Sequence, residues 1–251
     1  MTDDQWIAEL IQSLGRGNWH PSGTSIEDQA HGIDALLKEG EASVPFLLNA
    51  LFNENEKIRF GAIDALAWSH LDSVLGAIIY VLQNDVDSRI RAKAARSLLF
   101  VRDERVIPAL IEAIHDRDWD VRNSSRSTLR TIGSSAFEAV FIALRDSIQP
   151  LQLGPFSQAV PGTSELIHLL GDFEDERAVD LLVSYVASPN VSLKERAIAS
   201  LGRIGSERAT EPLIELTRDT DSNIRREAVC ALCELGDERA RERVISIVRD
   251  P

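Results

Sequence analysis

The chain has little cysteine and no long apolar run. Its 251 residues include two cysteines, which are too few for a disulfide framework of the kind found in small secreted proteins. No stretch approaches 18 consecutive apolar residues, so we expect no membrane insertion. The first four residues, Met1 to Asp4, lack the basic and apolar segments of a signal peptide. These absences together predict a cytoplasmic protein.

Basic residues are also in deficit. The chain has 27 Lys and Arg against 40 Asp and Glu, a formal net charge of −13. A protein that holds DNA or RNA needs a basic surface to neutralise phosphates, so we expect no nucleic-acid partner. Gly-x-Ser-x-Gly, a phosphate-binding glycine loop and His-Glu-x-x-His are all missing as well. The sequence therefore offers no candidate catalytic residue.

The sequence does contain an internal repeat, marked by an aliphatic residue followed by a basic one. The pairs are Ile58-Arg59, Ile90-Arg91, Val121-Arg122, Leu193-Lys194 and Ile224-Arg225. Neighbouring pairs are 32, 31, 72 and 31 residues apart, and 72 corresponds to two repeats plus about ten inserted residues. A fixed period of this length is typical of a solenoid.

Each pair lies at the start of a predicted helix. Three residues before it stands a residue type that caps helices: Asn55, Asp87, Asp118, Asn190 and Asp221. Eight residues after its aliphatic member stands a leucine in every repeat: Leu66, Leu98, Leu129, Leu201 and Leu232. With small residues at the fourth position between, this spacing draws one apolar stripe along an α-helix.

A second helix is predicted after a short turn. Gly133, Gly205 and Gly236 are placed to end the first helix in a left-handed conformation. Pro108 and Pro212 lie where the first turn of the second helix is expected, and a missing N–H costs little there. Nothing alternates like a strand. The predicted fold is all-α, a right-handed superhelix of about seven helical hairpins.

The predicted boundaries are a capping helix and loop over residues 1–24 and a solenoid over residues 25–251. The capping helix itself is expected from Asp4 to Leu14. The fifth repeat is irregular, because an insertion at about 146–162 carries three prolines that prevent a continuous helix. In that repeat we expect Leu170-Gly171 to form the turn. Arginines that follow the turns, such as Arg105, are expected to form ion-pair ladders between repeats.

These residues resemble the HEAT-like repeat family first recognised in phycobilin lyases. Its hallmark combines Asp, an aliphatic-Arg pair, Ala-Leu and Gly-acidic, and residues 221–240 match it nearly throughout. The resemblance implies an α-solenoid. It also implies alternative functions: a subunit of a phycobiliprotein bilin lyase or isomerase, another phycobilisome-associated factor, or an iron–sulfur assembly partner. In the first case the partner would be a phycobiliprotein and the cofactor a bilin.

Cys230 and Cys233 are the weak metal candidates of the chain. Three residues apart on one predicted helix, they share a face and could ligate a metal or half an iron–sulfur cluster. A complete site needs more ligands, and all five histidines belong to earlier repeats. His-Glu pairs, which HEAT-like diiron hydroxylases carry, are absent. We therefore expect no metal site and no resident cofactor.

Recognition of a protein partner is the favoured function. The residue 22 positions after each aliphatic member should line a groove formed by the second helices: Tyr80, Glu112, Ala143, Ser184, Glu215 and Ser246. His115 lies one turn beyond Glu112. Such a mildly acidic, partly apolar groove suits a protein surface or an amphipathic helix better than a phosphate. A loop at 149–161 is expected at its edge.

Aromatic residues add two further candidates. Trp119 stands among acids in a predicted turn, where it serves either partner contact or local packing. Trp68 and Phe100 share one offset in consecutive repeats, so we expect them side by side, as an aromatic patch or packed under the turn between repeats. The predicted partner-binding set is Tyr80, Glu112, His115, Trp119 and Glu215, in a non-enzymatic scaffold or chaperone.

Overall fold

The computed structural model describes residues 3–15, 33, 35–36, 38–67, 72–101, 103–147, 162–236 and 238–249. Every regular element in these ranges is a helix, which confirms the all-α prediction. The chain divides into two compact units, residues 1–113 with 118–128, and residues 114–117 with 129–251. The division falls inside the predicted solenoid. The handedness of the superhelix stays a prediction.

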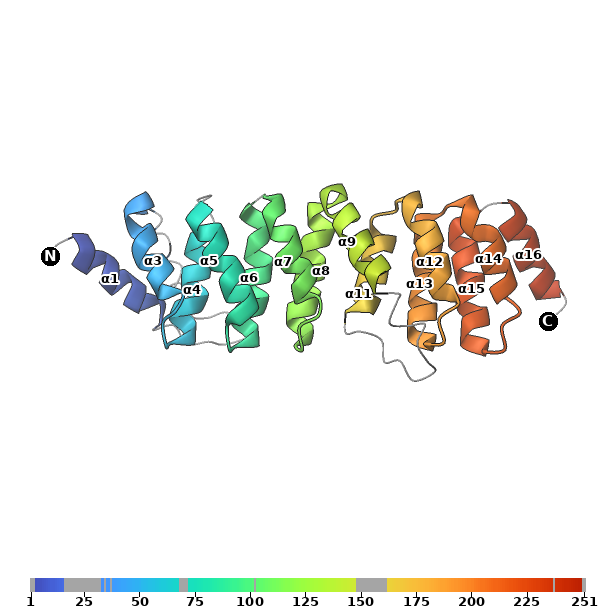
Figure 1. Ribbon diagram of the computed structural model, residues 1–251, viewed down its shortest axis with the longest axis horizontal. Coiled ribbons are helices and arrows are strands. Elements are labelled where there is room, and N and C mark those ends of the chain that lie inside the picture. The colour runs from blue at the N-terminus through green and yellow to red at the C-terminus, as the bar shows by residue number, and fades with distance from the viewer. Residues whose placement is uncertain are drawn as a thin grey trace. The chain divides into compact units, whose positions relative to one another are not determined.

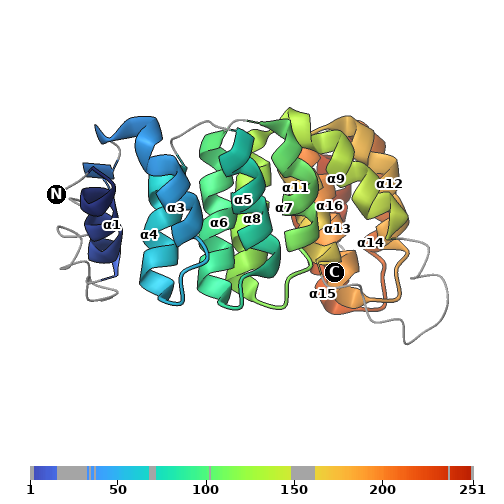
Figure 2. The same cartoon turned by 60° about the vertical axis from the view of Figure 1, so that its left-hand side comes forward.

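The first unit consists of helices stacked side by side (Figure 1). They are α1 (Asp3–Leu14), α3 (Val44–Ala50), α4 (Glu56–Leu66), α5 (Asp72–Asn84), α6 (Ser88–Val101), α7 (Ile107–Ala113) and the first ten residues of α8 (Trp119–Ile132). Short 3-10 turns, η1 (Gly40–Ser43) and η2 (Glu104–Val106), precede α3 and α7. α4 packs on α6, and α5 packs on both α6 and α7. α1 packs against α3 and α4, as expected of a helix that covers the first repeat (Figure 2).

The second unit repeats the same arrangement. Its helices are the last four residues of α8 with α9 (Ser134–Asp146), α11 (Thr163–Asp172), α12 (Val179–Val186), α13 (Val191–Ile204), α14 (Thr210–Leu216), α15 (Ser222–Leu235) and α16 (Glu238–Arg249). The 3-10 turns η3 (Glu176–Ala178) and η4 (Glu207–Ala209) precede α12 and α14. α13 packs between α11 and α15, while α12 packs on α13 and α14 on α15. We call α4, α6, α8, α11, α13 and α15 the first helices, and the others of each hairpin the second helices.

The predicted caps and core positions are confirmed. The side chains of all five capping residues accept a hydrogen bond from a backbone N–H two or three residues further on. The aliphatic members of the pairs are at most 2% exposed, and the five leucines at most 1%. Each buried leucine contributes about 2 kcal/mol by removing its apolar surface from water. The stripe read from the sequence is thus the core between the two helix layers.

The basic member of the pair has a structural role that explains its recurrence. Arg59, Arg91 and Arg225 each donate from Nη1 to two backbone carbonyls, six and five residues earlier in the chain. Those carbonyls belong to the loop between one repeat's second helix and the next repeat's first helix. A guanidinium has the several donors that such a double contact needs, so the arginine fixes this loop.

An acidic residue in the following loop joins two repeats through the same basic side chain. Arg59 makes a two-pronged ion pair with Asp85 of the next repeat, at 2.8 and 3.1 Å. Asp85 also accepts from the N–H of Asp87. In the second unit Lys194 pairs with Asp219 at 3.2 Å, and Asp219 accepts from the N–H two residues later. Both pairs are largely buried and tie neighbouring repeats together.

Two sequence expectations about glycine turns need correction. The turn of the fifth repeat does not form at Leu170-Gly171, because both residues lie inside α11. A Cβ at Gly171 would lie 2.7 Å from the side chain of Ser200, so this glycine permits close packing of α11 on α13. The left-handed residue of that turn is Glu174, with φ 53°. Gly205 and Gly236 end helices in the left-handed region as predicted, whereas Gly133 has φ 78° and ψ −140°, outside it.

The arginines after the turns form bridges of two kinds. Arg208 pairs with Asp180 and Arg239 with Glu211, in each case across one repeat, which fits the predicted ladder. Arg105 pairs with Asp103 in its own turn. Arg177 does both, through Asp175 and, at 3.8 Å, Glu138. The arginine is exposed in each of these pairs, so each bridge adds less than about 1 kcal/mol.

Candidate protein-binding surface

The segments 44–53 and 73–84, which include α3 and all of α5 after its first residue, lack charged residues in a strongly charged chain. Residues 44–53 and 73–84 contain no Asp, Glu, Lys or Arg, although these types make up 27% of the sequence. The solvent-exposed positions are Pro45, Asn49, Phe52, Ser73, Gly76, Tyr80, Gln83 and Asn84. We call these eight residues the α3–α5 surface. Depletion of charge together with aromatic residues is the compositional mark of the core of a protein interface.

Two aromatic side chains stand at the centre of this surface's exposed apolar area. Phe52 is 57% exposed and Tyr80 is 54% exposed. Their ring centroids are 5.7 Å apart at an interplanar angle of 67°, an edge-to-face contact. This arrangement is favourable for aromatic pairs and holds both rings at the surface. The pair is therefore a preformed aromatic cluster on the surface.

Polar groups extend the surface toward α7. Gln83 donates from Nε2 to the carboxylate of Glu112 at 2.6 Å. Asn84 donates to the backbone carbonyl of Tyr80, which fixes the last turn of α5 beside the tyrosine. Glu112 is exposed on α7. Tyr80 and Glu112 thus lie on neighbouring second helices, as the 22-residue offset predicted.

The predicted partner-binding residues fall in two units. Tyr80, Glu112 and Trp119 belong to the first, whereas His115 and Glu215 belong to the second. Trp119 opens α8 and is 62% exposed, so it does not pack in the repeat core. His115 follows α7 and is half-buried, and a Cβ on Gly162 would lie 2.5 Å from its Nδ1. Glu215 is exposed on α14.

Phe52 is the residue that the sequence reasoning missed. It follows α3 just past Leu47, Ala50 and Leu51, which are all buried. Phe52 lies outside the helical face that Leu47, Ala50 and Leu51 form. Its spacing from these residues could have identified it as exposed. Trp68, which was expected beside Phe100, and the loop 149–161, which was expected at the edge of the groove, lie outside the described residues.

The two cysteines lie on the outer part of α15. Cys230 and Cys233 are both exposed, and both are free thiols. Within the described ranges no group of three or more His, Cys, Asp or Glu is arranged to hold a metal ion. A bound cluster would therefore need ligands from elsewhere.

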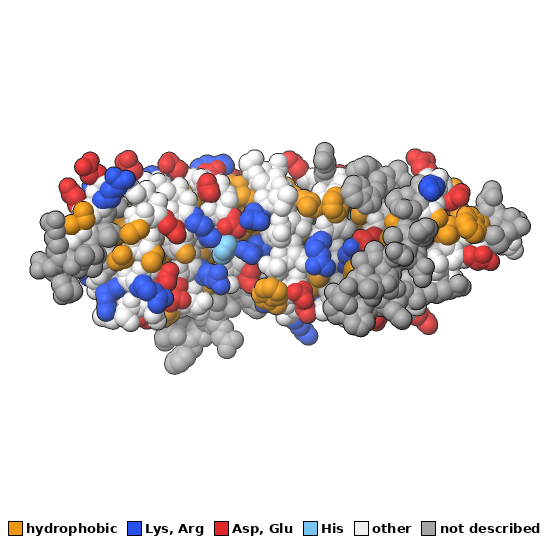
Figure 3. Space-filling model, turned by 180° about the vertical axis from the view of Figure 1, so that it is seen from behind, with side chains coloured by type: hydrophobic (Ala, Val, Ile, Leu, Met, Phe, Trp, Pro, Cys, Tyr) orange, Lys and Arg blue, Asp and Glu red, His pale blue; other side chains and the backbone are white. Residues whose placement is uncertain are grey.

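Charge is unevenly divided between the first helices and the rest of the chain. The first helices contain fourteen Lys and Arg against eight Asp and Glu, whereas the rest of the chain contains thirteen against thirty-two. Figure 3 shows basic side chains gathered around a histidine on one face, with acidic side chains mostly along its edges. The first helices are therefore net basic, although the whole chain has a net charge of −13.

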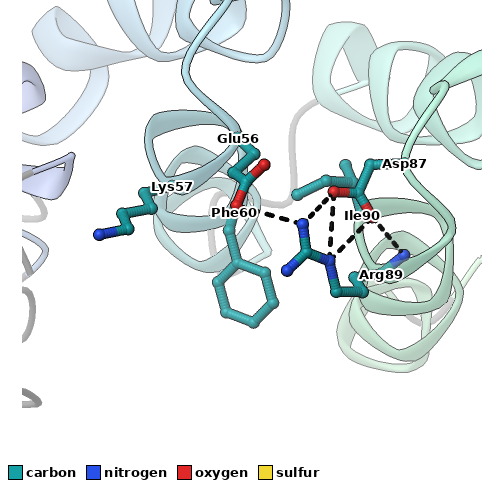
Figure 4. A pocket seen from close by; sticks show the side chains of 6 residues that line it. All are labelled: Glu56, Lys57, Phe60, Asp87, Arg89 and Ile90. Atoms are coloured by element: carbon teal, nitrogen blue, oxygen red, sulfur yellow. Dashed lines mark hydrogen bonds and ion pairs between the residues drawn. The ribbon is translucent and has the colours of Figure 1, made fainter. Parts of the chain in front are cut away.

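A narrow crevice between α4 and α6 shows how part of that basic charge is neutralised. Arg89 lies between Asp87 and Glu56, and it donates to the Asp87 carboxylate at 2.5–3.2 Å (Figure 4). These hydrogen bonds hold the pKa of Asp87 below its ordinary value. The crevice has a volume of about 10 Å³, room for about one water molecule. It is a structural contact between repeats and too small for a ligand.

Comparison with known proteins agrees with this architecture. A family model described as HEAT repeats matches residues 44–130, 75–149, 163–222 and 179–251. The chain belongs to the HEAT repeat family. It matches no curated protein. Within the described residues, no helix is long and apolar enough to cross a membrane.

Several solved structures share the HEAT fold. One, from a study of microtubule plus-end tracking by XMAP215, CLIP-170 and EB1, has 14% identity and a TM-score of 0.57, covering 80% of this chain and 92% of that one. The archaeal HEAT-like repeats protein of Thermococcus onnurineus NA1 has 14% identity and a TM-score of 0.52, covering 95% and 98%. The phycocyanin lyase complex of CpcE and CpcF from Nostoc sp. PCC7120 has 20% identity and a TM-score of 0.43, covering 80% and 79%. At these identities the first two likenesses establish the fold alone, and no conclusion is drawn from the third, whose TM-score is below 0.5.

Proposed function

We propose that this HEAT repeat protein is a non-enzymatic scaffold that binds a protein partner through the α3–α5 surface. The observation that carries the proposal is the edge-to-face pair of Phe52 and Tyr80, more than half exposed on a surface without charge. In a chain of net charge −13, this surface lacks the charged side chains that favour contact with water. Its composition favours contact with another protein.

The energetic argument rests on the aromatic rings. A phenylalanine or tyrosine that passes from half-exposed to buried contributes about 1–3 kcal/mol to binding, and aromatic residues are frequent anchors of interfaces. Little side-chain entropy is lost at Tyr80 and Phe52, because the two rings already contact each other. The amide groups of Asn49, Gln83 and Asn84 can supply hydrogen bonds around the anchor.

The test compares capture of partners by the tagged wild-type chain and by the variant with Phe52→Ala and Tyr80→Ala, using lysate of the source organism. We expect at least one protein to be enriched by the wild type and reduced tenfold or more by the double variant. Val191→Ala is the matched control, since Val191 is 46% exposed on α13 in the second unit. Equal enrichment by all three chains would contradict the proposal.

The same variants must retain the fold for the comparison to count. Phe52 and Tyr80 expose more than half of their surface, so their truncation costs only their mutual contact and the buried part of each ring. We expect the helical circular dichroism signal of the double variant to equal that of the wild type. Because the two readouts are separate, loss of capture with an intact fold assigns the effect to the surface.

A further inference from the structure

The first-helix face of the first unit carries an open pocket of about 460 Å³. α6 supplies most of its lining, including Lys93, Arg96 and Phe100. Asp64 of α4, Ala67 just after α4, and Thr128 of α8 complete it together with their neighbours. Pockets of 300–1,000 Å³ are the usual size for a small ligand or for a few side chains of a bound peptide. This pocket is separate from the α3–α5 surface, which is formed by second helices.

The pocket retains one positive charge after its internal ion pair is counted. Lys93 forms an ion pair with Asp64, and its ammonium lies 4.6 Å from the centroid of the Phe60 ring. Arg96 also lines the pocket and is exposed. Among the residues that the structure describes, it has no carboxylate partner. Its guanidinium is thus available for a bidentate contact with a carboxylate.

An apolar wall stands beside that guanidinium. Phe100 follows Arg96 by four residues on α6, so the two side chains share one face of the helix, and Phe100 is 41% exposed. Leu99 and Ala67 add apolar surface to the lining. The hydroxyls of Ser97 and Thr128 donate to the backbone carbonyls of Ala94 and Ala95, so their protons are already engaged. Arg96 is therefore the charged donor of the lining that remains after Lys93 is paired with Asp64.

We propose that this pocket binds a carboxylate that carries an apolar group, presented as an acidic side chain beside an aromatic or aliphatic residue in a peptide segment. One uncompensated guanidinium matches one carboxylate, and Phe100 with Leu99 and Ala67 matches the apolar neighbour. An extended polyanion would need several uncompensated cations, whereas in the lining Lys93 is already paired with Asp64 and Arg96 alone remains. A free organic acid offers the same chemistry from a second source, and the experiment separates the two.

The experiment follows backbone amide shifts of the full chain by NMR during titration with defined probes. The peptide probes are acetyl-Phe-Glu-amide and its neutral isostere acetyl-Phe-Gln-amide, and the free acid is 3-phenylpropionate. We expect saturable shifts at residues 93–100 with acetyl-Phe-Glu-amide and at least tenfold weaker binding of the Gln peptide. Tighter binding of the Glu peptide than of 3-phenylpropionate supports the peptide source, and the reverse assigns the pocket to a free acid.

Variants connect the binding to Arg96. Arg96→Gln should weaken binding of the acidic probe at least tenfold, and Arg96→Lys should retain part of it, because an ammonium keeps the charge but loses the bidentate geometry. Arg196→Gln is the matched control, since it removes the same charge from an exposed first-helix position on α13. The proposal is overturned if no probe saturates these shifts, if the Glu and Gln peptides bind equally, or if Arg96→Gln binds as the wild type does.

Discussion

Asp85→Ala should destabilise the protein far more than its place in a surface loop would indicate. The Asp85 side chain is 7% exposed and that of its partner Arg59 is 11% exposed. Removing the carboxylate leaves a guanidinium that is largely buried without its counter-charge, and it also removes the acceptor for the N–H of Asp87. Breaking a buried ion pair from one side costs about 3–5 kcal/mol. We expect a loss of free energy of unfolding within that range.

The measurement is urea unfolding of the full chain followed by circular dichroism at 222 nm. Asp180→Ala is the matched control, because its 2.6 Å pair with Arg208 has side chains that are 80% and 52% exposed. An exposed pair of this kind contributes about 0–1 kcal/mol. In a double-mutant cycle, Arg59→Met should cost less in the Asp85→Ala background than in the wild type, because the ion pair is then already absent. Equal losses for Asp85→Ala and Asp180→Ala would refute the role of Asp85 as a buried contact between repeats.

Three further outcomes follow from the contacts described above. Leu201→Ala and Leu232→Ala should each lower the free energy of unfolding by about 2–5 kcal/mol in the same assay, because both leucines are buried. Losses under about 0.5 kcal/mol at both positions would show that the recurring leucines do not form a packed core. Hydrogen bonds from Arg89, Arg105 and Arg177, and from the N–H of Asp221, hold the pKa of Asp87, Asp103, Asp175 and Asp219 below their ordinary 3.8. The stability that these carboxyls contribute is therefore present above about pH 4 and is lost as the pH falls below 3.8 and the carboxylates become protonated. We expect the melting temperature to fall in this range of pH. A melting temperature that stays constant down to about pH 2 would contradict this prediction. Cys230→Ser with Cys233→Ser should leave the melting temperature unchanged because both side chains are exposed, and a drop of several degrees would show an unrecognised structural role.

The repeat architecture could be predicted because its signals are local and recur. Capping residues such as Asp221 act within their own first turn, and leucines such as Leu232 repeat at helical spacing. The turn at Gly171 was predicted wrongly because this glycine allows close packing against Ser200 on another helix. No local sequence pattern reveals such a contact. Arg59 and Asp85 are 26 residues apart, so their pairing likewise appears only in the fold.

The candidate surface was predictable only in part. Tyr80 was found because it occupies a recurring offset from an aliphatic-basic pair. Its ring partner Phe52 belongs to the first repeat, which has no such pair. The pocket around Arg96 combines residues from three helices, and the position of its uncompensated cation depends on which of Lys93 and Arg96 is paired with Asp64. Such pairing is a property of side-chain geometry and not of sequence spacing.

Site-specific photo-crosslinking tests the proposed scaffold function most directly. p-Benzoylphenylalanine is introduced in place of Tyr80, or in place of Val191 as the control, and the full chain is irradiated in cells of the source organism. A partner that covers the α3–α5 surface should give a discrete cross-linked protein species with the probe at position 80 and none at position 191. The same species at both positions, or none at position 80, would contradict protein binding through Phe52 and Tyr80.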